Sequence, residues 1–422
     1  MKVLVIGSGG REHAIVLALK KSSKVSKIYC APGNGGIGRV AENVPIEVTD
    51  VDSVISFVQE NSIDLTFVAP ENPLAIGMVD SMEEEGLRVF GPRANAAVLE
   101  GSKAFSKEFM KRHAIPTAQY EVFDDADKAL EYLKTSKMPI VIKADGLAFG
   151  KGVIIAENYD EAAGAIRDMM LDNKFGESGN RIVIEEFLSG REMSVLAFTD
   201  GKSIKIMPSA QDHKRVFDGD RGPNTGGMGA YARSPINTDE ISEYCMEKIF
   251  RPTIEGMAKE GRTFKGVIYF GLIVTKDGVY VIEYNARFGD PETQAVLPLL
   301  ETDFIDIIDA VIDEKLGNLD IKWSGDSAVC VVLASGGYPG KYENGFEIMG
   351  LYSEFADNII VYHSGTKYEN GKMLTNGGRV LGVTAVAESL EAARGEAYKA
   401  LKHISFENMI YRTDICLTPD GV

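Results

Sequence analysis

The feature that most constrains the fold is an alternation in the first hundred residues. Short apolar runs at 2–6, 27–30, 65–68 and 88–90 are separated by helical patterns at 11–20, 51–61 and 77–85. Strands that alternate with helices pair in parallel, joined by right-handed crossovers that place helices on the faces of the sheet. We therefore expect an N-terminal doubly wound parallel sheet, within a chain of α/β and α+β domains.

The carboxyl ends of such strands form the ligand-binding edge of the sheet. The first of them carries Gly7-Ser-Gly9 and opens a helix, which is compatible with a dinucleotide site, a structural turn or a phosphate seat. A dinucleotide site is disfavoured because Glu12 stands where the third glycine belongs and no acid follows the second strand. Gly10 and Arg11 at the helix N-terminus would suit a single phosphate.

A second glycine-rich segment joins two predicted strands, at 140–143 and 153–156. It is not a P-loop, because Gly152 replaces the Ser or Thr and a strand follows in place of a helix. A glycine hairpin can fold over a triphosphate, with backbone N–H groups and Lys143 facing the anion. An ordinary hairpin with spare glycines is the alternative.

The predicted strand 182–185 ends in the acids Glu185 and Glu186. The backbone of a strand end can bind an adenine edge while a nearby carboxylate binds ribose hydroxyls. Paired acids at a strand end are more often solvated, so this pattern is weak by itself.

The strongest local pattern is the segment 281–294. The period of two places Glu283, Asn285 and Arg287 on one face of a strand that pairs with 266–275 through a Lys-Asp-Gly turn. Carboxylate and amide oxygens suit a hard divalent cation, and the guanidinium suits a phosphoryl group in transfer. A solvent-facing ladder of ion pairs is the alternative, although the apolar context argues for burial.

A polar stretch without apolar periodicity covers 211–229, and we expect it to be a functional loop. Farther on, strands at 328–334, 359–364 and 379–387 and a helix at 389–403 predict a small C-terminal α+β domain. No Ser/His/Asp arrangement or reactive cysteine context indicates a covalent nucleophile.

Charge and cysteine usage narrow the class of partner. Asp and Glu outnumber Lys and Arg by 62 to 45, a net charge of -17, which argues against nucleic-acid binding. The four cysteines, at 30, 245, 330 and 416, lie far apart and indicate reduced, mostly buried thiols. Apolar runs are too short for a membrane span, and no signal peptide precedes the first strand, so we expect a cytoplasmic protein.

Taken together, these motifs resemble the phosphoribosylamine–glycine ligase family of the ATP-grasp superfamily, which acts in purine biosynthesis. The resemblance covers essentially the whole chain. It rests on Gly7-Ser-Gly-Gly-Arg-Glu-His, Lys143-Ala-Asp-Gly-Leu-Ala, Gln211-Asp-His-Lys-Arg, Gly222-Pro-Asn-Thr-Gly-Gly-Met-Gly-Ala-Tyr, Arg287-Phe-Gly-Asp-Pro-Glu-Thr-Gln and Thr375-Asn-Gly-Gly-Arg-Val. It implies a Rossmann-like domain at 1–101, an ATP-grasp domain at 102–322 with a mobile lid at about 120–190, and a C-terminal domain at 323–422.

The resemblance also implies roles for individual residues. ATP would be bound by Lys103, Lys143, Gly146, Gly150, Gly152, Glu185, Glu186, Leu188 and Glu192, and Mg²⁺ or Mn²⁺ by Glu283 and Asn285. Arg287 would be catalytic. Phosphoribosylamine and glycine would contact a set comprising Gly9, Gly10, Arg11, Gly33, Asn34, Gly35, Glu71, Asp212, His213, Lys214, Asn376 and Arg379. Many ATP-grasp relatives carry a further metal-binding acid at the position that Gly271 occupies here.

The leading interpretation is an ATP-dependent ligase, expected to be monomeric, whose partners are ATP, glycine and 5-phosphoribosylamine, and which binds no nucleic acid and no membrane. A nucleotide-binding sensor of the same fold is the alternative, disfavoured by the retention of Arg287. An NAD-linked oxidoreductase is a third interpretation, disfavoured by Glu12 and the missing ribose acid.

Overall fold

The first hundred residues form the predicted parallel sheet, in a computed structural model that describes residues 1–147, 152–172, 176–351 and 353–417. All strand pairs of this sheet are parallel, in the order β3-β2-β1-β4-β5. A helix missed by sequence analysis, α3, precedes the left-handed Gly77. The elements are β1 (Lys2–Gly7), α1 (Gly10–Lys20), β2 (Lys27–Pro32), η1 (Ile37–Arg39), β3 (Glu42–Asn43), α2 (Val51–Asn61), β4 (Leu65–Val68), α3 (Glu71–Ala75), α4 (Met78–Glu84), β5 (Val89–Phe90) and α5 (Ala94–Gly101).

Helices cover both faces of this sheet, which confirms the doubly wound architecture. Successive residues of β1 point to opposite faces, so Val3 and Val5 join one apolar core while Leu4 and Ile6 join another. The first core includes side chains of α1 and of α12 (Phe304–Ile312), and the second includes side chains of α2, α4 and α5. The N-terminal sheet therefore depends on a helix more than two hundred residues away in sequence.

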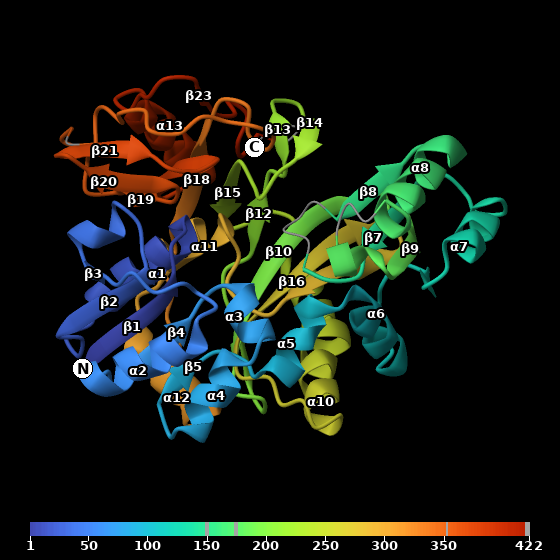
Figure 1. Cartoon of the computed structure of the whole chain (residues 1–422), viewed down its shortest axis with the longest axis horizontal. Coiled ribbons are helices and arrows are strands. Elements are labelled where there is room, and N and C mark those ends of the chain that lie inside the picture. The colour runs from blue at the N-terminus through green and yellow to red at the C-terminus, as the bar shows by residue number, and fades with distance from the viewer. Residues whose placement is uncertain (148–151, 173–175, 352, 418–422) are drawn as a thin grey trace.

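A separate antiparallel sheet, in the order β6-β9-β7-β8, lies within the predicted lid region. It projects from the body at the right of Figure 1 and encloses an apolar core of its own with α7 and α8. The elements are α6 (Lys103–Arg112), β6 (Tyr120–Phe123), α7 (Ala126–Leu133), β7 (Ile140–Ala144), β8 (Val153–Ala156), α8 (Tyr159–Met170), η2 (Gly176–Gly179) and β9 (Ile182–Glu186).

A ten-stranded sheet forms the centre of the molecule. Eight of its strands follow the path β17-β16-β10-β12-β15-β18-β22-β19, and β11 and β23 pair with β10 and β18 beside this path. The predicted hairpin of β16 and β17 is confirmed as an antiparallel pair. The central elements are β10 (Arg191–Thr199), β11 (Ile204–Ile206), β12 (Ala210–Asp212), β13 (Arg215–Phe217), β14 (Arg221–Asn224), β15 (Gly229–Ala232), α9 (Asp239–Cys245), the π-helix η3 (Met246–Phe250), α10 (Arg251–Lys259), β16 (Gly266–Thr275), β17 (Gly278–Asn285), α11 (Glu292–Val296), η4 (Leu297–Leu299) and η5 (Leu316–Asn318).

The interpretation of 211–229 as a loop is wrong in secondary structure. The segment contains parts of β12 and β15, which belong to the central sheet, and the hairpin of β13 and β14. Strands of three or four residues are too short to show a period of two in sequence.

The C-terminal strands continue the same sheet, because β18 pairs with β15 as well as with β22. Helix α13 packs against β18 and β22. The elements are β18 (Ser327–Ser335), β19 (Ile359–His363), β20 (Thr366–Glu369), β21 (Lys372–Thr375), β22 (Arg379–Ala387), α13 (Leu390–Leu401) and β23 (Met409–Ile410).

The cysteines are free and buried, as the sequence predicted. Within the described ranges, the chain has no helix that combines the length and the apolar character needed to cross a membrane.

A pair of buried histidines joins the N-terminal and C-terminal parts. The backbone N–H of His363 donates a hydrogen bond of 2.8 Å to Nδ1 of His13 on α1. Burial, and then the nearby His363, lower the pKa of His13 from 6.5 to about 3. His13 is therefore neutral in the folded protein, as the hydrogen bond to Nδ1 requires.

We predict that acid destabilises the protein partly through His13. Below pH 6.5 the unfolded chain protonates this residue, whereas the folded chain does not until about pH 3. Protonation of His13 in the unfolded chain therefore lowers the free energy of unfolding as the pH falls below 6.5. This loss reaches about 2 kcal/mol at pH 5. Urea unfolding of His13→Gln should show a smaller loss of stability between pH 7 and pH 5 than the wild type, and the exposed His403→Gln should not. Equal losses in all three proteins would contradict this prediction.

Candidate active site

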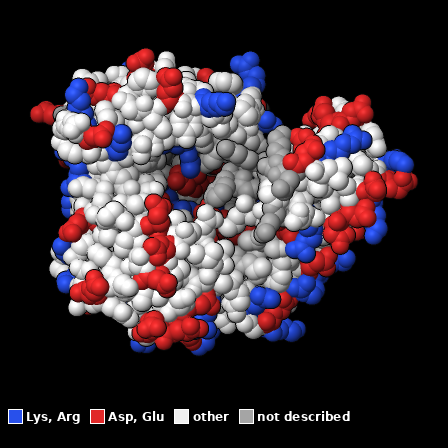
Figure 2. Space-filling view, in the orientation of Figure 1, with Lys and Arg blue, Asp and Glu red and all other residues white. Residues whose placement is uncertain are grey.

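Most of the charged site residues predicted from the sequence gather around a cleft between the lid, the central sheet and the N-terminal part, where Lys103, Lys143, Lys214 and Arg287 surround Glu283. Figure 2 shows a hollow near the middle of this face, with acidic and basic side chains inside it. Some charged side chains within this cleft form ion pairs with other side chains of the protein, and others do not. This difference indicates which kind of ligand each side chain can bind.

A buried ion-pair chain lies on the lid side of the cleft. Nζ of Lys143 lies 3.0 Å from Oε1 of Glu185, and Nζ of Lys107 lies 2.8 Å from Oε2 of the same carboxylate. Burial, moderated by Glu185, lowers the pKa of Lys107 to about 8. Glu185 is thus not a solvated acid. Its neighbour Glu186 is exposed and accepts a hydrogen bond of 2.8 Å from the backbone N–H of Gln119.

The glycine-rich hairpin is anchored at its described end. Nζ of Lys103 donates to the carbonyl of Gly146 at 2.9 Å, and Ser102 donates to Asp145 at 2.9 Å. Gly146 has a φ of +149°, and an added Cβ would lie 2.3 Å from Oγ of Ser178, so the backbone there requires glycine. Gly152 is buried, whereas Gly150 lies outside the described residues.

Leu188 and Glu192 lie where the lid connects to the central sheet. Leu188 is partly buried in the link between β9 and β10. Glu192 lies on β10 and is half exposed.

The predicted metal pair lies at the end of β17. Glu283 and Asn285 are partly buried, and the described part of the chain provides neither with a side-chain hydrogen bond or ion pair. Although burial opposes it, the positive charges of Lys214, Lys143 and Lys103 lower the pKa of Glu283. These two oxygen donors fit Mg²⁺ or Mn²⁺, because such ions commonly take one or two protein ligands and complete their shell with phosphate oxygens and water. The described residues contain no cluster of three acidic, histidine or cysteine side chains placed to hold a metal.

Arg287 follows the metal pair and is held by two carboxylates. Its Nη2 lies 2.8 Å from Oε1 of Glu100, and its Nε lies 3.3 Å from Oε2 of Glu71. Glu100 also accepts a hydrogen bond of 2.7 Å from the backbone N–H of Ala286. Burial opposes ionisation of Glu71, but Arg287 and Arg11 bring its pKa down to about 2. The ladder of ion pairs is therefore partly buried and spans two parts of the chain.

A second cluster of ionisable side chains comprises Asp212, at the end of β12, and the next two residues, His213 and Lys214. Lys214 Nζ forms an ion pair of 2.9 Å with Glu192. Burial, and to a lesser degree the charges of Glu292, Glu192 and Glu283, raise the pKa of Asp212 to about 7, although Lys214 opposes this. His213 is buried, and burial lowers its pKa to about 4.

Arg379 connects the C-terminal sheet to the segment after Arg287. Its Nη1 donates to the carbonyls of Gly226 at 2.7 Å and Asp290 at 2.9 Å, and it lies 3.2 Å from Oδ1 of Asp290. An added Cβ at Gly226 would approach Arg379 to 3.0 Å, so the Gly226-Gly227 turn lies directly against the guanidinium.

The N-terminal loop differs in detail from a simple phosphate seat. Glu12 accepts a hydrogen bond of 2.6 Å from the backbone N–H of Gly9, and its other oxygen lies 2.6 Å from Nε of Arg11. Arg11 also donates to the carbonyl of Phe288 at 3.1 Å. A carboxylate of the protein therefore lies at the N-terminus of α1, next to Gly10, where the pyrophosphate of a dinucleotide would bind.

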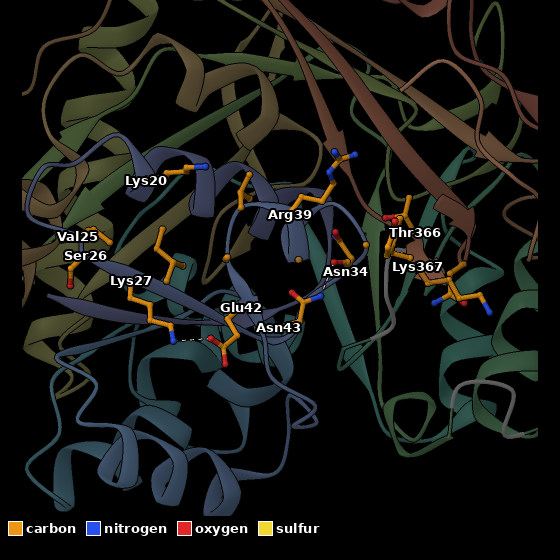
Figure 3. A pocket seen from close by; sticks show the side chains of 18 residues that line it. Lys20, Val25, Ser26, Lys27, Asn34, Arg39, Glu42, Asn43, Thr366 and Lys367 are labelled. Carbon is orange, nitrogen blue, oxygen red and sulfur yellow. Dashed lines mark hydrogen bonds and ion pairs between the residues drawn. The ribbon is translucent and has the colours of Figure 1, made fainter. Parts of the chain in front are cut away.

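A groove of about 1290 Å³ contains a third group of predicted substrate residues, namely Gly33, Asn34, Gly35 and Asn376. Figure 3 shows Asn34 and Asn43 beside Thr366 and Lys367, and the backbone N–H of Gly35 donates a hydrogen bond of 2.9 Å to the carbonyl of Thr366. The amide of Asn34 is fully engaged, because Nδ2 donates to Ser8 and His363 carbonyls and Oδ1 accepts from two backbone N–H groups. Asn34 thus fixes the loop between the two parts of the chain.

Three buried side chains of the site were missed by sequence analysis. Lys107 lies one helical turn after Lys103 on α6, and that spacing could have indicated it. Glu100 and Glu292 gave no such signal, because their partners are distant in sequence.

The chain matches three profiles of one family. Residues 1–100 match phosphoribosylglycinamide synthetase, N domain; residues 101–293 match its ATP-grasp (A) domain; and residues 328–418 match its C domain. A curated relative from Caldanaerobacter subterraneus, called phosphoribosylamine–glycine ligase, is 50% identical over 415 residues, which cover 98% of this chain and 99% of the relative. A relative of that name from Salmonella typhimurium is 48% identical, with 98% of each chain covered.

Solved structures show the same relationship. A crystal structure of phosphoribosylamine–glycine ligase from Thermotoga maritima has a TM-score of 0.86 at 35% identity and covers 98% of this chain and 100% of that one. The biotin carboxylase domain of a Hydrogenobacter thermophilus 2-oxoglutarate carboxylase has a TM-score of 0.76 at 17% identity, covering 97% of this chain and 91% of that one, so it shares the fold.

We predict that Glu100→Gln destabilises the fold by about 2 kcal/mol or more, because it removes the nearest carboxylate from a buried guanidinium. Denaturant unfolding measures this loss. The matched control is Glu83→Gln, which removes an exposed partner of Arg93 and should cost less than about 1 kcal/mol. Equal effects of the two substitutions would show that Arg287 does not depend on Glu100.

Proposed function

The chain belongs to the phosphoribosylglycinamide synthetase family, and on that basis we propose how its residues perform the family's reaction. It is an ATP-grasp ligase of purine biosynthesis. Glycine and 5-phosphoribosylamine are joined to glycinamide ribonucleotide while ATP is converted to ADP and phosphate. The sensor and oxidoreductase alternatives are not favoured.

ATP would lie between the lid and the central sheet. Lys103 and Lys143 would face its phosphates, with the hairpin that includes Gly146, Gly150 and Gly152 above them. Glu185, Glu186 and Leu188 would frame adenine, and Glu192 would bind ribose. The buried contacts of Lys143 with Glu185, and of Lys103 with Gly146, support this placement because they orient both ammonium groups in advance.

A divalent cation, Mg²⁺ or Mn²⁺, would be held by Glu283 and Asn285. When bound, such an ion neutralises charge on the β- and γ-phosphates. The absence of other partners for these two side chains among the described residues supports the assignment.

The observation that carries the mechanism is that Arg287 stands directly after this pair, held by Glu71 and Glu100. A fixed guanidinium stabilises charge on a transferring phosphoryl group without reorganising during the reaction. A carboxylate oxygen of glycine would attack the γ-phosphorus, and ADP would leave. The amine of phosphoribosylamine would then attack the carbonyl carbon of glycyl phosphate, losing a proton as inorganic phosphate departs.

The remaining predicted residues would seat phosphoribosylamine and glycine. Those on the side of Arg287 and Asp290 are Gly9, Gly10, Arg11, Glu71 and Arg379. Asp212 and Lys214 lie near Glu283, and His213 stands between them in the chain. Those in the groove of Figure 3 are Gly33, Asn34, Gly35 and Asn376. Because Arg11 is already engaged by Glu12, and the amide of Asn34 is fully hydrogen-bonded within the protein, each of these two would contribute by positioning its loop.

We also propose that the chain has three domains, comprising residues 1–101, 102–322 and 323–422. The lid at about 120–190 would move as a unit over ATP, and the enzyme would be a monomer. The separate apolar core of the lid supports its movement as one body.

We predict that Glu283→Gln lowers turnover by roughly 10²-fold or more and leaves the fold intact, because the substitution keeps volume but removes a metal ligand's charge. Steady-state ADP formation and a thermal unfolding profile measure the two effects. Near-wild-type turnover at low millimolar Mg²⁺ would contradict the metal assignment.

We predict that glycine labelled with ¹⁸O in its carboxylate transfers one labelled oxygen to inorganic phosphate, since phosphate leaves with the oxygen that attacked ATP. Mass spectrometry of the phosphate measures the transfer. Label in AMP, or AMP and pyrophosphate as products, would indicate an adenylate and overturn this mechanism.

A further inference from the structure

Glu292, which has no assigned role, is a buried carboxylate without a cationic partner. Its residue is only 3% exposed. No lysine, arginine or histidine nitrogen lies within 4 Å of its carboxylate in the part of the chain that the structure describes. Burial of an unpaired carboxylate is costly, so such a group is usually paired with a protein cation, a metal or a ligand.

Two hydroxyl groups hold this carboxylate in place. Oε1 of Glu292 accepts a hydrogen bond of 3.0 Å from Tyr269 and one of 3.3 Å from Ser194, and the two hydroxyls are 2.8 Å apart. Both of these hydrogen bonds are accepted by Oε1. Oε2 has no side-chain or backbone donor among the described residues, and it is the oxygen left to meet a ligand.

The sheet register relates Glu292 to the proposed metal pair. Tyr269 is the cross-strand partner of Asn285, and Ser194 is the partner of Gly271, which itself pairs with Glu283. Cross-strand partners share a face of the sheet, so the two hydroxyls and the metal pair point to the same side. An added Cβ at Gly271 would lie 3.1 Å from Cγ of Glu283 and 3.5 Å from the ring of Tyr269, so the absence of a side chain lets these two residues approach each other.

The divalent cation of the reaction is already assigned to Glu283 and Asn285. Oε1 of Glu292 is occupied by two hydroxyl donors, which leaves one oxygen, and a single oxygen suits a hydrogen-bonding ammonium. An organic ammonium is the remaining cation that the reaction supplies.

The two amines of the reaction differ in the protonation they need. A neighbouring carboxylate favours the protonated form of an amine. The amine of phosphoribosylamine attacks as a nucleophile and must be unprotonated, whereas glycine's amine is not consumed and is best kept as an ammonium. Glycine also lacks a side chain, so its ammonium is the one group besides the carboxylate that a protein can recognise.

We infer that Glu292, held by Ser194 and Tyr269, binds the ammonium group of glycine and selects glycine by that group. The carboxylate of glycine then faces the end of β17 and Arg287. The inference rests on the proposed function and adds to it the residue that recognises the amino acid.

The test compares glycine with glycolate, which replaces the ammonium by a hydroxyl. In Glu292→Gln the KM for glycine should rise about 10- to 100-fold, because a charge-assisted hydrogen bond is lost. The KM values for ATP and phosphoribosylamine should change by less than about 3-fold. In the wild type the KM for glycine should be lower than the inhibition constant of glycolate. Glu292→Gln should lose most of this difference, which a merely structural role would not alter.

Two further variants keep the test decisive. Tyr269→Phe retains the charge but frees the carboxylate, and it should raise the KM for glycine in the same direction by a smaller factor. Glu301→Gln, an exposed acid nearby, is the matched control and should have wild-type constants. An unchanged preference for glycine over glycolate, or a rise confined to the KM for phosphoribosylamine, would overturn the inference. Absence of glycine-dependent ADP formation in the wild type would instead overturn the proposed function.

Discussion

The ion pairs around Arg287 are the constraint on which the rest of the site depends. A guanidinium removed from water must be compensated, and Glu71 and Glu100 provide this from the N-terminal part of the chain. Because Glu100 also binds the backbone N–H of Ala286, the same contacts fix the path of the chain directly after β17. The edge of the parallel sheet and the end of the central sheet are therefore locked together where the substrates would meet.

The paired and unpaired charges of the cleft have different roles. Glu185 lies between Lys107 and Lys143, so this group is compensated within the protein and can present preformed ammonium groups to an anion. Glu283 and Glu292 have no ion-pair partner within the described residues. The positive charges of Lys214, Lys143 and Lys103 keep Glu283 ionised without a direct ion pair, so its oxygens are left to bind a cation.

Part of the site could be predicted from local sequence. Glu283 and Asn285 were placed on one strand face because side chains alternate along a strand, and the glycine hairpin was recognised from its position between two strands. The polar segment 211–229 was wrongly interpreted as a loop, since its strands are too short for periodicity to register. Glu100 and Glu292 were missed because a carboxylate in an ordinary helix looks the same in sequence whether it faces water or a distant partner. Lys107 was missed although its spacing of one helical turn from Lys103 places both on one face.

The sequence alone determined the alternating strands and helices of the first hundred residues, the hairpin of β16 and β17, and the family to which the motifs point. These depend on local backbone preference and on spacings within a few residues. The tertiary structure decided that α12 covers the N-terminal sheet, that β15 pairs with β18, and that Arg287 lies between Glu71 and Glu100. Each of these joins segments roughly a hundred or more residues apart, and such contacts follow from how the whole chain packs its apolar faces, which no local spacing specifies.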